Sequence, residues 1–180
     1  MTYDDILPRK AEDKWNKIAP LRILSVDIEC QGRKGHFPEA EKDPVIQIAN
    51  VVSIYGQKKP IVQNVFTLKG CLPIVGAQVI TSDKEDEMLA KWSAFLRTVD
   101  PDIITGYNVQ NFDIPYLLNR AQTLQKQKNI TGKYSLQKFA QWGRIRNVNA
   151  KMSNSTFESA AHGRRTNIDT TIEGRVTFDM

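Results

Sequence analysis

Two carboxylates stand two residues apart at the end of an apolar stretch. The stretch runs Leu-Arg-Ile-Leu-Ser-Val-Asp-Ile-Glu over residues 21–29, and Asp27 and Glu29 are its acids. Residues two apart in a β-strand share a face, so both carboxylates would project together while Val26 and Ile28 face the other side. Neighbouring carboxylates repel unless a cation neutralises them, and hard oxygen ligands favour Mg²⁺ or Mn²⁺. The pair indicates a divalent-metal site, although a solvent-exposed strand end would hold two acids equally well.

A second polar group precedes a predicted helix. Residues 108–113 are Asn-Val-Gln-Asn-Phe-Asp, and Asp113 stands at or just before the helix start. The free N–H groups and dipole of a helix N-terminus favour an ionised carboxylate, so Asp113 could simply be an N-cap. Asn108 and Asn111 add donors and acceptors at an expected sheet edge. Phe112 could fill the core or offer a surface on which a nucleobase stacks.

Positive charge is concentrated in one part of the chain, whose formal net charge is +5. Residues 126–165 hold nine basic side chains against one acid, Glu158, while the remainder holds 16 basic and 19 acidic. Such a local field suits a phosphate backbone, although a solvated loop would show the same composition. The basic residues are Lys126, Lys128, Lys133, Lys138, Arg144, Arg146, Lys151, Arg164 and Arg165, and the last five are candidate DNA contacts.

The composition is that of a folded protein with one domain. The chain has 180 residues, of which 41% are apolar and 25% charged, which excludes a disordered or fibrous protein. Its apolar runs are too short to span a membrane, and its start has no secretory signal. Cys30 and Cys71 form no disulfide framework and make a poor zinc site, so reduced thiols in a cytosolic or nuclear protein are expected.

The predicted elements alternate between strands and helices. Strands are expected at 21–29, 45–54, 61–68 and 102–107, with a strand at 174–180, and helices at about 85–99 and 115–124. Ser82 and Glu85 fit a Ser-x-x-Glu capping box for the first helix, Asp100-Pro101 ends it, and Pro115 suits the first turn of the second. Residues 144–152 and 166–172 could pair as a hairpin. This order predicts an α/β fold with a mixed sheet flanked by helices, and acids at a strand end fit the usual place of a site in such sheets.

These motifs resemble a known family. Asp27-Ile28-Glu29 resembles the first motif of DEDD-type 3′→5′ exonucleases, and Asn108-x-x-x-Phe112-Asp113 resembles the second. The flanking sequence resembles the exonuclease domain of family-B replicative DNA polymerases of the delta type. The resemblance covers residues 15–125 nearly continuously, with residues 19–22, 32–38, 43–48, 101–108 and 120–124 as its clearest stretches, and it resumes at 163–165 and 174–176.

The resemblance implies a ribonuclease-H-like mixed β-sheet flanked by helices, with a lead-in at residues 1–20 and a partial exonuclease domain at 21–180. It implies two Mg²⁺ or Mn²⁺ ions held by Asp27, Glu29 and Asp113. Asn108, Asn111 and Phe112 would then bind the substrate, the single-stranded 3′ end of a DNA primer, and nucleoside monophosphates would be released. Residues 126–172 would be a basic insert, with a possible β-hairpin that helps to separate primer from template. The implied partners are the remaining polymerase domains, accessory subunits and a sliding clamp, in the nucleus.

One part of the family pattern is absent. The third motif, Tyr-x-x-x-Asp, supplies a tyrosine that orients water and a fourth acidic ligand. None of the five tyrosines has aspartate four positions later, and no polymerase motif with paired aspartates is present. The resemblance therefore predicts a C-terminally incomplete domain that is nearly inactive in isolation. Two alternatives stay open: a non-catalytic exonuclease-like module that binds DNA or neighbouring domains, and a self-standing exonuclease of another DEDD family.

Overall fold

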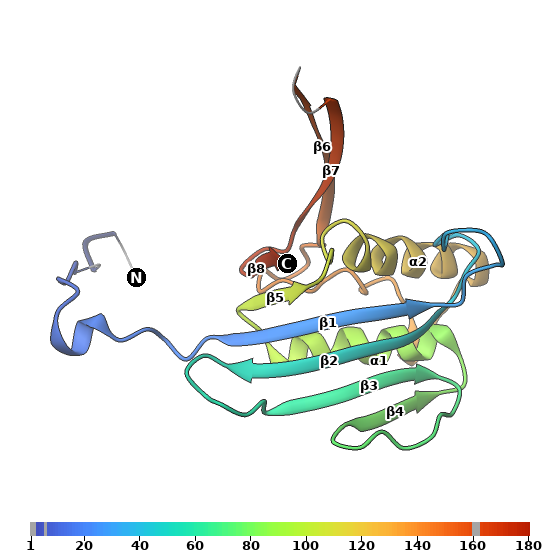
Figure 1. Ribbon diagram of the computed structural model, residues 1–180, viewed down its shortest axis with the longest axis horizontal. Coiled ribbons are helices and arrows are strands. Elements are labelled where there is room, and N and C mark those ends of the chain that lie inside the picture. Colours follow the sequence, from blue (N-terminus) through green and yellow to red (C-terminus); the bar gives the residue numbers. More distant parts are fainter. Residues whose placement is uncertain (1–2, 6, 160–162) are drawn as a thin grey trace.

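A mixed sheet of six strands forms the centre of the computed structural model, which describes residues 3–5, 7–159 and 163–180. The strand order is β4-β3-β2-β1-β5-β8, and β6 and β7 form a separate hairpin (Figure 1). The strands are β1 (Arg22–Cys30), β2 (Val45–Ile54), β3 (Val62–Leu68), β4 (Gln78–Ser82), β5 (Ile103–Gly106), β6 (Lys151–Ser159), β7 (Gly163–Thr171) and β8 (Val176–Asp179). The helices are α1 (Glu85–Val99) and α2 (Asp113–Lys128), with 3₁₀ turns at Tyr3–Asp5, Asp13–Asn16 and Gly132–Tyr134. The predicted α/β class is confirmed.

The pairing of β1 determines where the sheet ends. β1 pairs antiparallel with β2 along its length, but it pairs parallel with β5 only over residues 23–25. β5 in turn pairs parallel with β8. The last residues of β1 therefore extend past the carboxyl ends of β5 and β8, and Asp27 and Glu29 lie on this extension.

One face of the sheet is covered and the other is open near the acids. Leu24, Val26 and Ile28 alternate along β1 and are buried in a single cluster with apolar residues of α1 and α2, including Trp92 and Leu117. Alternation places the two acids of β1 on the opposite face, where both are exposed. The period-two pattern of the sequence thus correctly predicted the directions of these side chains.

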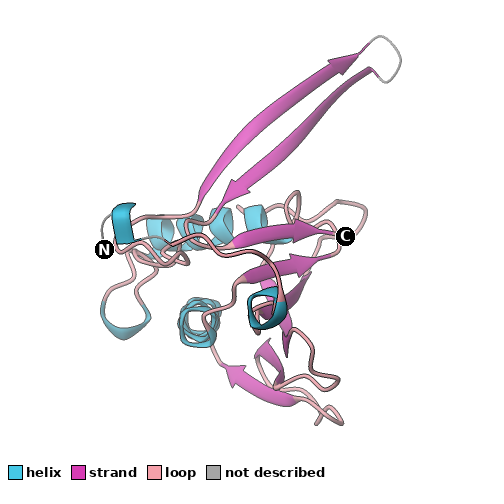
Figure 2. Ribbon diagram, turned by 90° about the vertical axis from the view of Figure 1, so that its left-hand side faces the viewer, coloured by secondary structure: helices cyan, strands magenta, loops and turns pink. Residues whose placement is uncertain are grey.

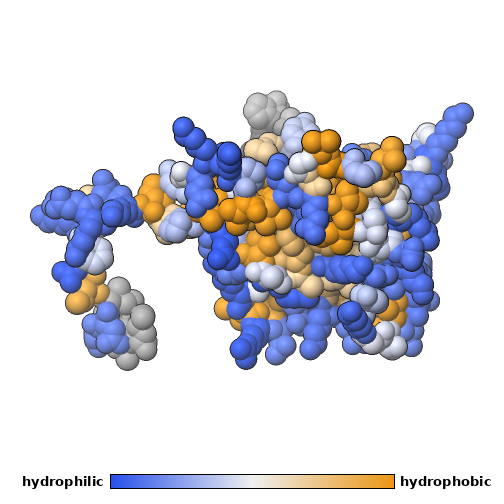
Figure 3. All heavy atoms as spheres, turned by 90° about the horizontal axis from the view of Figure 1, so that it is seen from below, coloured by the Kyte–Doolittle hydropathy of each residue, from blue (hydrophilic) through white to orange (hydrophobic). Residues whose placement is uncertain are grey.

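Large exposed apolar residues lie along the β4 edge of the sheet. β4 forms the edge farthest from β8, and Figure 3 views the molecule from this side, where apolar surface is visible among polar side chains. The β3–β4 loop and the start of β3 contribute large exposed apolar residues, namely Ile61, Leu72, Ile74 and Val75. The acidic residues of β1 therefore lie away from this apolar edge.

The structure differs from the sequence prediction at β4 and at the start of α1. β4 was not predicted, because a five-residue strand between Gly76 and a helix gives little periodicity. The capping box is also absent: Ser82 ends β4, α1 follows Lys84, and no side chain caps it. Glu85 turns inward instead, where its carboxylate accepts the Val45 N–H and pairs with Arg120. A fully paired buried carboxylate replaces the predicted contact with the helix end.

The predicted hairpin exists, but its first strand lies further along the chain. β6 begins at Lys151, whereas the sequence suggested residues 144–152. Arg144 is held on the body of the domain by Asp100 and Asp102, so the chain cannot leave the body until later. Figures 1 and 2 show β6 and β7 projecting from the domain, while the lead-in extends away at another side, with residues 7–20 all exposed.

Candidate active site at the carboxyl end of β1

Asp27 and Glu29 lie side by side on the open face of β1, and both are exposed. Within the described residues neither of them forms an ion pair with a lysine, arginine or histidine. A hollow of about 350 Å³ lies beside Asp27, and its lining includes Val51, Gly106 and Tyr107. The pair is therefore accessible to a solute and has no protein cation as its partner.

Asp113 reaches the same strand from the side. It is the first residue of α2, and its side chain is buried, with 2% relative exposure. Its Oδ1 accepts the backbone N–H of Ile28 at 2.9 Å. Because β5 ends before this level of β1, the Ile28 N–H meets the Asp113 carboxylate in place of a strand carbonyl. The predicted position of Asp113 at the helix start is correct, and its carboxylate accepts the N–H of a strand residue as well as its own backbone N–H.

The surroundings of Asp113 oppose its negative charge. The pKa of Asp113 is raised from 3.8 to about 6, mainly by burial and also by the carboxylates of Asp27 and Asp179. The N–H of Ile28 acts in the opposite direction. Like charges at short range resist joint ionisation unless a cation joins them. The set has the chemistry of a hard-cation site: oxygen donors only, and excess negative charge.

The three predicted acids reach one end of the sheet but do not form a closed ligand set. In the described part of the chain, no three acidic, histidine or cysteine side chains are grouped closely enough to hold a metal ion. Asp113 is directed to the backbone of β1, whereas Asp27 and Glu29 project from its open face. The expected convergence is thus observed for the backbone positions and for the electrostatic contact of Asp27 with Asp113. It is not observed for the three side chains together.

A tight turn connects β5 to Asp113. A Cβ atom on Gly106 would lie 2.5 Å from the Val26 carbonyl oxygen, so only glycine allows this approach to β1. Asn108 has a φ of 56°, and its carbonyl accepts the N–H groups of Asn111 and Phe112. Asparagine tolerates this left-handed conformation better than most residues, so its backbone explains its presence here. A role of the Asn108 side chain in binding substrate stays a prediction.

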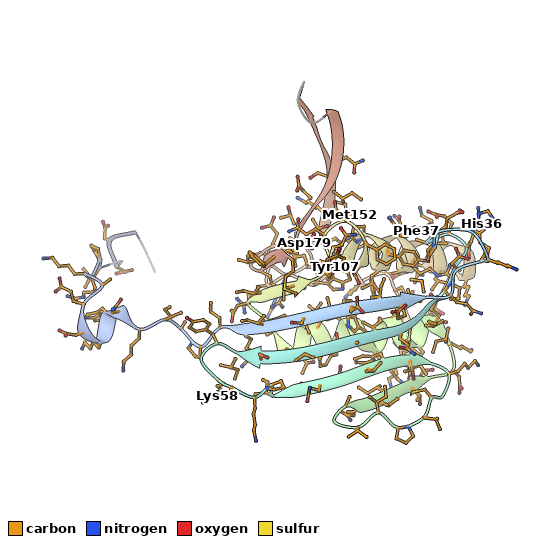
Figure 4. The ribbon with its side chains drawn as sticks, viewed as in Figure 1. His36, Phe37, Lys58, Tyr107, Met152 and Asp179 are labelled. Atoms are coloured by element: carbon orange, nitrogen blue, oxygen red, sulfur yellow. The ribbon has the colours of Figure 1, made fainter. Side chains whose placement is uncertain are left out.

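Three consecutive residues tie this turn to its neighbours. The N–H of Val109 donates to Asp179 Oδ1 at 3.0 Å, and Gln110 Nε2 donates to the Thr177 carbonyl at 3.1 Å. The Oδ1 of Asn111 accepts the N–H of Ile168, in β7, at 3.1 Å. Asp179 and Tyr107 are labelled in Figure 4 near the root of the hairpin. The sequence did not predict Asp179, because only the parallel pairing of Gly106 with Asp179 brings the two segments together.

An aromatic group lies next to Asp113. Phe112 contacts Phe37 edge to face at 5.3 Å between ring centroids, and Tyr116 at 5.5 Å. Phe112 is partly buried and packs on the core, whereas Phe37 is 75% exposed. Figure 4 shows Phe37 and His36 on the loop above α2. Phe37 is the more available stacking surface, and sequence analysis missed it because its loop has no periodicity.

The comparison with known proteins agrees with this geometry. The family described as "DNA polymerase family B, exonuclease domain" matches residues 1–180. This chain belongs to that family. It is 51% identical over 180 residues to the DNA polymerase delta catalytic subunit of Drosophila melanogaster, and 49% identical over 178 residues to that of Arabidopsis thaliana. These matches cover 100% and 99% of the chain but only 16% and 15% of the relatives, so the chain spans about one sixth of their length. The six-stranded sheet flanked by helices is consistent with the fold of the family.

The loop that carries Phe37 in this exonuclease domain is anchored by buried polar groups. Arg120 donates to both oxygens of Glu85 at 2.8 Å and to the Ala40 carbonyl at 3.0 Å. The hydroxyl of Tyr116 donates to the Asp43 carbonyl at 2.7 Å. These bonds join both ends of the loop's second half to α1 and α2, so its position is defined by the domain core.

The basic residues of the exonuclease domain do not form one patch. The guanidinium of Arg144, one of the predicted DNA contacts, is bound to Asp100 and Asp102. Arg146 and Lys151 are exposed, and neither forms an ion pair with another described residue. Arg164 and Arg165 belong to β7, but their side chains lie outside the described part. Among the described residues no helix has the length and apolar character to cross a membrane.

Proposed function

We propose that this chain is part of the proofreading 3′→5′ exonuclease of a replicative, delta-type DNA polymerase. The observation that carries the proposal is the uncompensated group of acids at the end of β1, with Asp113 buried beside Asp27 and its pKa raised. A group of this kind is costly to a fold unless it has a function. Its presence in a chain about half identical to delta catalytic subunits supports that function here.

Asp27, Glu29 and Asp113 would hold two divalent ions, Mg²⁺ or Mn²⁺. Such a pair stabilises the attacking and leaving oxygens during phosphodiester hydrolysis. In this proposal Asp27 would contribute to holding both ions. The mutual repulsion of the acids supports it, because cations would draw the three side chains together.

The substrate would be the single-stranded 3′ end of a DNA primer, released as nucleoside monophosphates. A mispaired end reaches the site more readily, because unpairing costs least at a mismatch. Phe112, and Phe37 beside it, would stack on the terminal bases, while Arg146, Lys151, Arg164 and Arg165 would contact phosphates. The remaining domains of a longer polymerase, accessory subunits, a sliding clamp and a nuclear location are part of the same proposal.

The 180-residue chain alone would be nearly inactive. The family pattern includes a Tyr-x-x-x-Asp motif, and no tyrosine of this sequence has aspartate four positions later. One acidic ligand and the tyrosine that orients water would have to come from elsewhere in the protein. Robust Mg²⁺-dependent digestion of DNA by the isolated chain would contradict this part of the proposal.

The decisive experiment uses the full-length protein that contains this chain. Asp27→Ala and Glu29→Ala should each lower Mg²⁺-dependent release of nucleotides from a mismatched primer by at least about 100-fold, the scale on which a single stabilising group acts at a reacting centre. Asp83→Ala, at an exposed acid far along the chain from the site, is the matched control. If Asp27→Ala and Glu29→Ala both digest the mismatched primer at the wild-type rate, the proposal is wrong.

The open arrangement of the acids favours a second candidate, a non-catalytic module that holds DNA or neighbouring domains. In the described residues the three acids are not grouped as a metal site. If this candidate is correct, Asp27→Ala and Glu29→Ala should both raise Tm by relieving repulsion, and Mn²⁺ should leave the Tm of the wild type unchanged. A rise of Tm with Mn²⁺ that both variants abolish would favour the enzyme.

A further inference from the structure

The hairpin and the acidic site meet at one side chain. Asn111 lies two residues before Asp113, and its Oδ1 accepts the N–H of Ile168 in β7 at 3.1 Å. The same turn is held to β8 on its other side through Val109 and Gln110. The turn that leads to Asp113 is therefore bound to two separate structures, and the side chain of Asn111 makes the hydrogen bond to the hairpin.

Hydrogen bonds within the turn link Asn111 to the start of α2. The carbonyl of Asn108 accepts two N–H groups, from Asn111 and Phe112, and the Val109 carbonyl accepts the N–H of Ile114 in α2. A displacement of Asn111 is thus passed along the backbone to Asp113. At its far end Asp113 is bound to the Ile28 N–H of β1, so such a displacement changes that contact.

The hairpin is anchored close to Ile168. Thr170 and Ile172, just beyond it, are buried, with 9% and 2% relative exposure. The strands before this point project from the body of the domain (Figure 2). A change in the inclination of the hairpin therefore pivots near the residue that donates to Asn111.

We propose that Asn111 is a positioning residue that couples the orientation of the β6–β7 hairpin to the placement of the Asp113 carboxylate. This inference rests on the proposed function, because it takes Asp113 as a metal ligand, and it replaces direct substrate contact as the role of Asn111. Coupling between sites is reciprocal, so an ion bound at the acids must also steady the hairpin. The Asn111 bond is exposed to solvent, so we expect a coupling at the low end of the usual range, about five-fold.

Hydrogen exchange on the full-length protein tests the coupling, with Mn²⁺ as the probe. In the wild type, Mn²⁺ should slow exchange about five-fold in peptides covering β7 and should also slow it around Ile28. In Asn111→Ala the effect around Ile28 should persist while the effect in β7 disappears. Gln110→Ala is the matched control, because it removes a neighbouring bond of the same turn that goes to β8 and not to the hairpin. It should keep the β7 response.

The possible failures are separate. If Mn²⁺ slows exchange around Ile28 but β7 responds equally in wild type and Asn111→Ala, the coupling is refuted and the metal site stands. If Mn²⁺ has no effect around Ile28 in the wild type, the metal site of the proposed function fails. In EDTA, Asn111→Ala should then still speed exchange of the Ile28 amide more than Gln110→Ala does, and equal rates in the two variants would refute the positioning role on their own.

Discussion

Two of the buried carboxylates, those of Glu85 and Asp113, lie in opposite electrostatic surroundings. Glu85, with 6% relative exposure, receives two N–H bonds from Arg120 and one from the Val45 backbone. Asp113, with 2%, receives the Ile28 N–H and faces two further acids, Asp27 and Asp179. Both residues start a helix, so helix position alone does not distinguish them.

The difference separates a compensated buried charge from an uncompensated one. A buried charge is tolerated when a partner and hydrogen bonds compensate it, as around Glu85. Asp113 lacks a cationic partner among the described residues, and its raised pKa shows that the fold does not stabilise its ionised form. The first arrangement holds the Phe37 loop in place, and the second leaves negative charge available for a cation. Variants at each site should therefore change stability in opposite directions.

The largest effect is expected from Arg120→Met. This substitution leaves Glu85 buried without its cation, so the free energy of unfolding should fall by about 3–5 kcal/mol. Urea unfolding of the chain at pH 7 measures it. The double variant Arg120→Met/Glu85→Gln removes both charges and should recover a large part of the loss. A loss below about 1 kcal/mol for the single variant would mean that the pair behaves as a surface ion pair.

Asp113→Asn should have the opposite sign. The pKa of Asp113 is raised in the folded protein, so its contribution to stability is full below the unfolded pKa near 3.8 and is lost as pH rises through about 6. In EDTA at pH 7 the asparagine variant should be more stable than the wild type by up to about 3 kcal/mol, which corresponds to that pKa shift. At pH 4 this advantage should vanish, because the wild-type carboxyl is then protonated.

Urea unfolding at both pH values, for both proteins, gives the comparison. Asparagine is suited to this test because its Oδ1 can still accept the Ile28 N–H. A variant that is less stable than the wild type at pH 7 in EDTA would show that the Asp113 charge is compensated after all.

Much of this organisation could be predicted from the sequence where local patterns determine it. The alternation around Asp27 and Glu29 predicted their common face, and Pro115 predicted a helix start that places Asp113 at the beginning of α2. The family resemblance was also correct. These features depend on neighbours within a few residues, and their strand and helix periods are strong.

The errors concern contacts between distant segments. Glu85 was assigned to a helix cap because Ser82 has the right spacing. Its carboxylate instead forms an ion pair with Arg120, which is 35 residues away. Arg144 was counted among the basic residues that could contact DNA, and its pairing with Asp100 and Asp102, across more than 40 residues, was not visible in the sequence. No local spacing distinguishes a paired charge from a free one, so such roles require the fold.

Asp179 allows a finer version of the comparison, because it both adds charge near Asp113 and accepts the Val109 N–H. Asp179→Asn keeps an acceptor and removes the charge, so the pKa of Asp113 should fall toward its usual value. Asp179→Ala removes both, and it should cost about 1 kcal/mol relative to Asp179→Asn, the net value of one hydrogen bond. Carboxyl ¹³C NMR titration and urea unfolding measure the two effects. An unchanged Asp113 pKa in both variants would remove Asp179 from the acidic group.

The smallest effect is expected among the cations, where the same contrast between paired and free charge applies. Arg146 is exposed and unpaired within the described residues, so Arg146→Ala should weaken binding of single-stranded DNA about two- to five-fold and lower the salt slope by roughly one. Arg144→Ala should leave the affinity unchanged below its unfolding temperature, because Asp100 and Asp102 already neutralise this guanidinium. Fluorescence anisotropy over a series of salt concentrations separates the two variants. Equal losses of affinity would mean that DNA displaces the aspartates from Arg144, and that pairing in the free domain does not exclude a cation from the DNA surface.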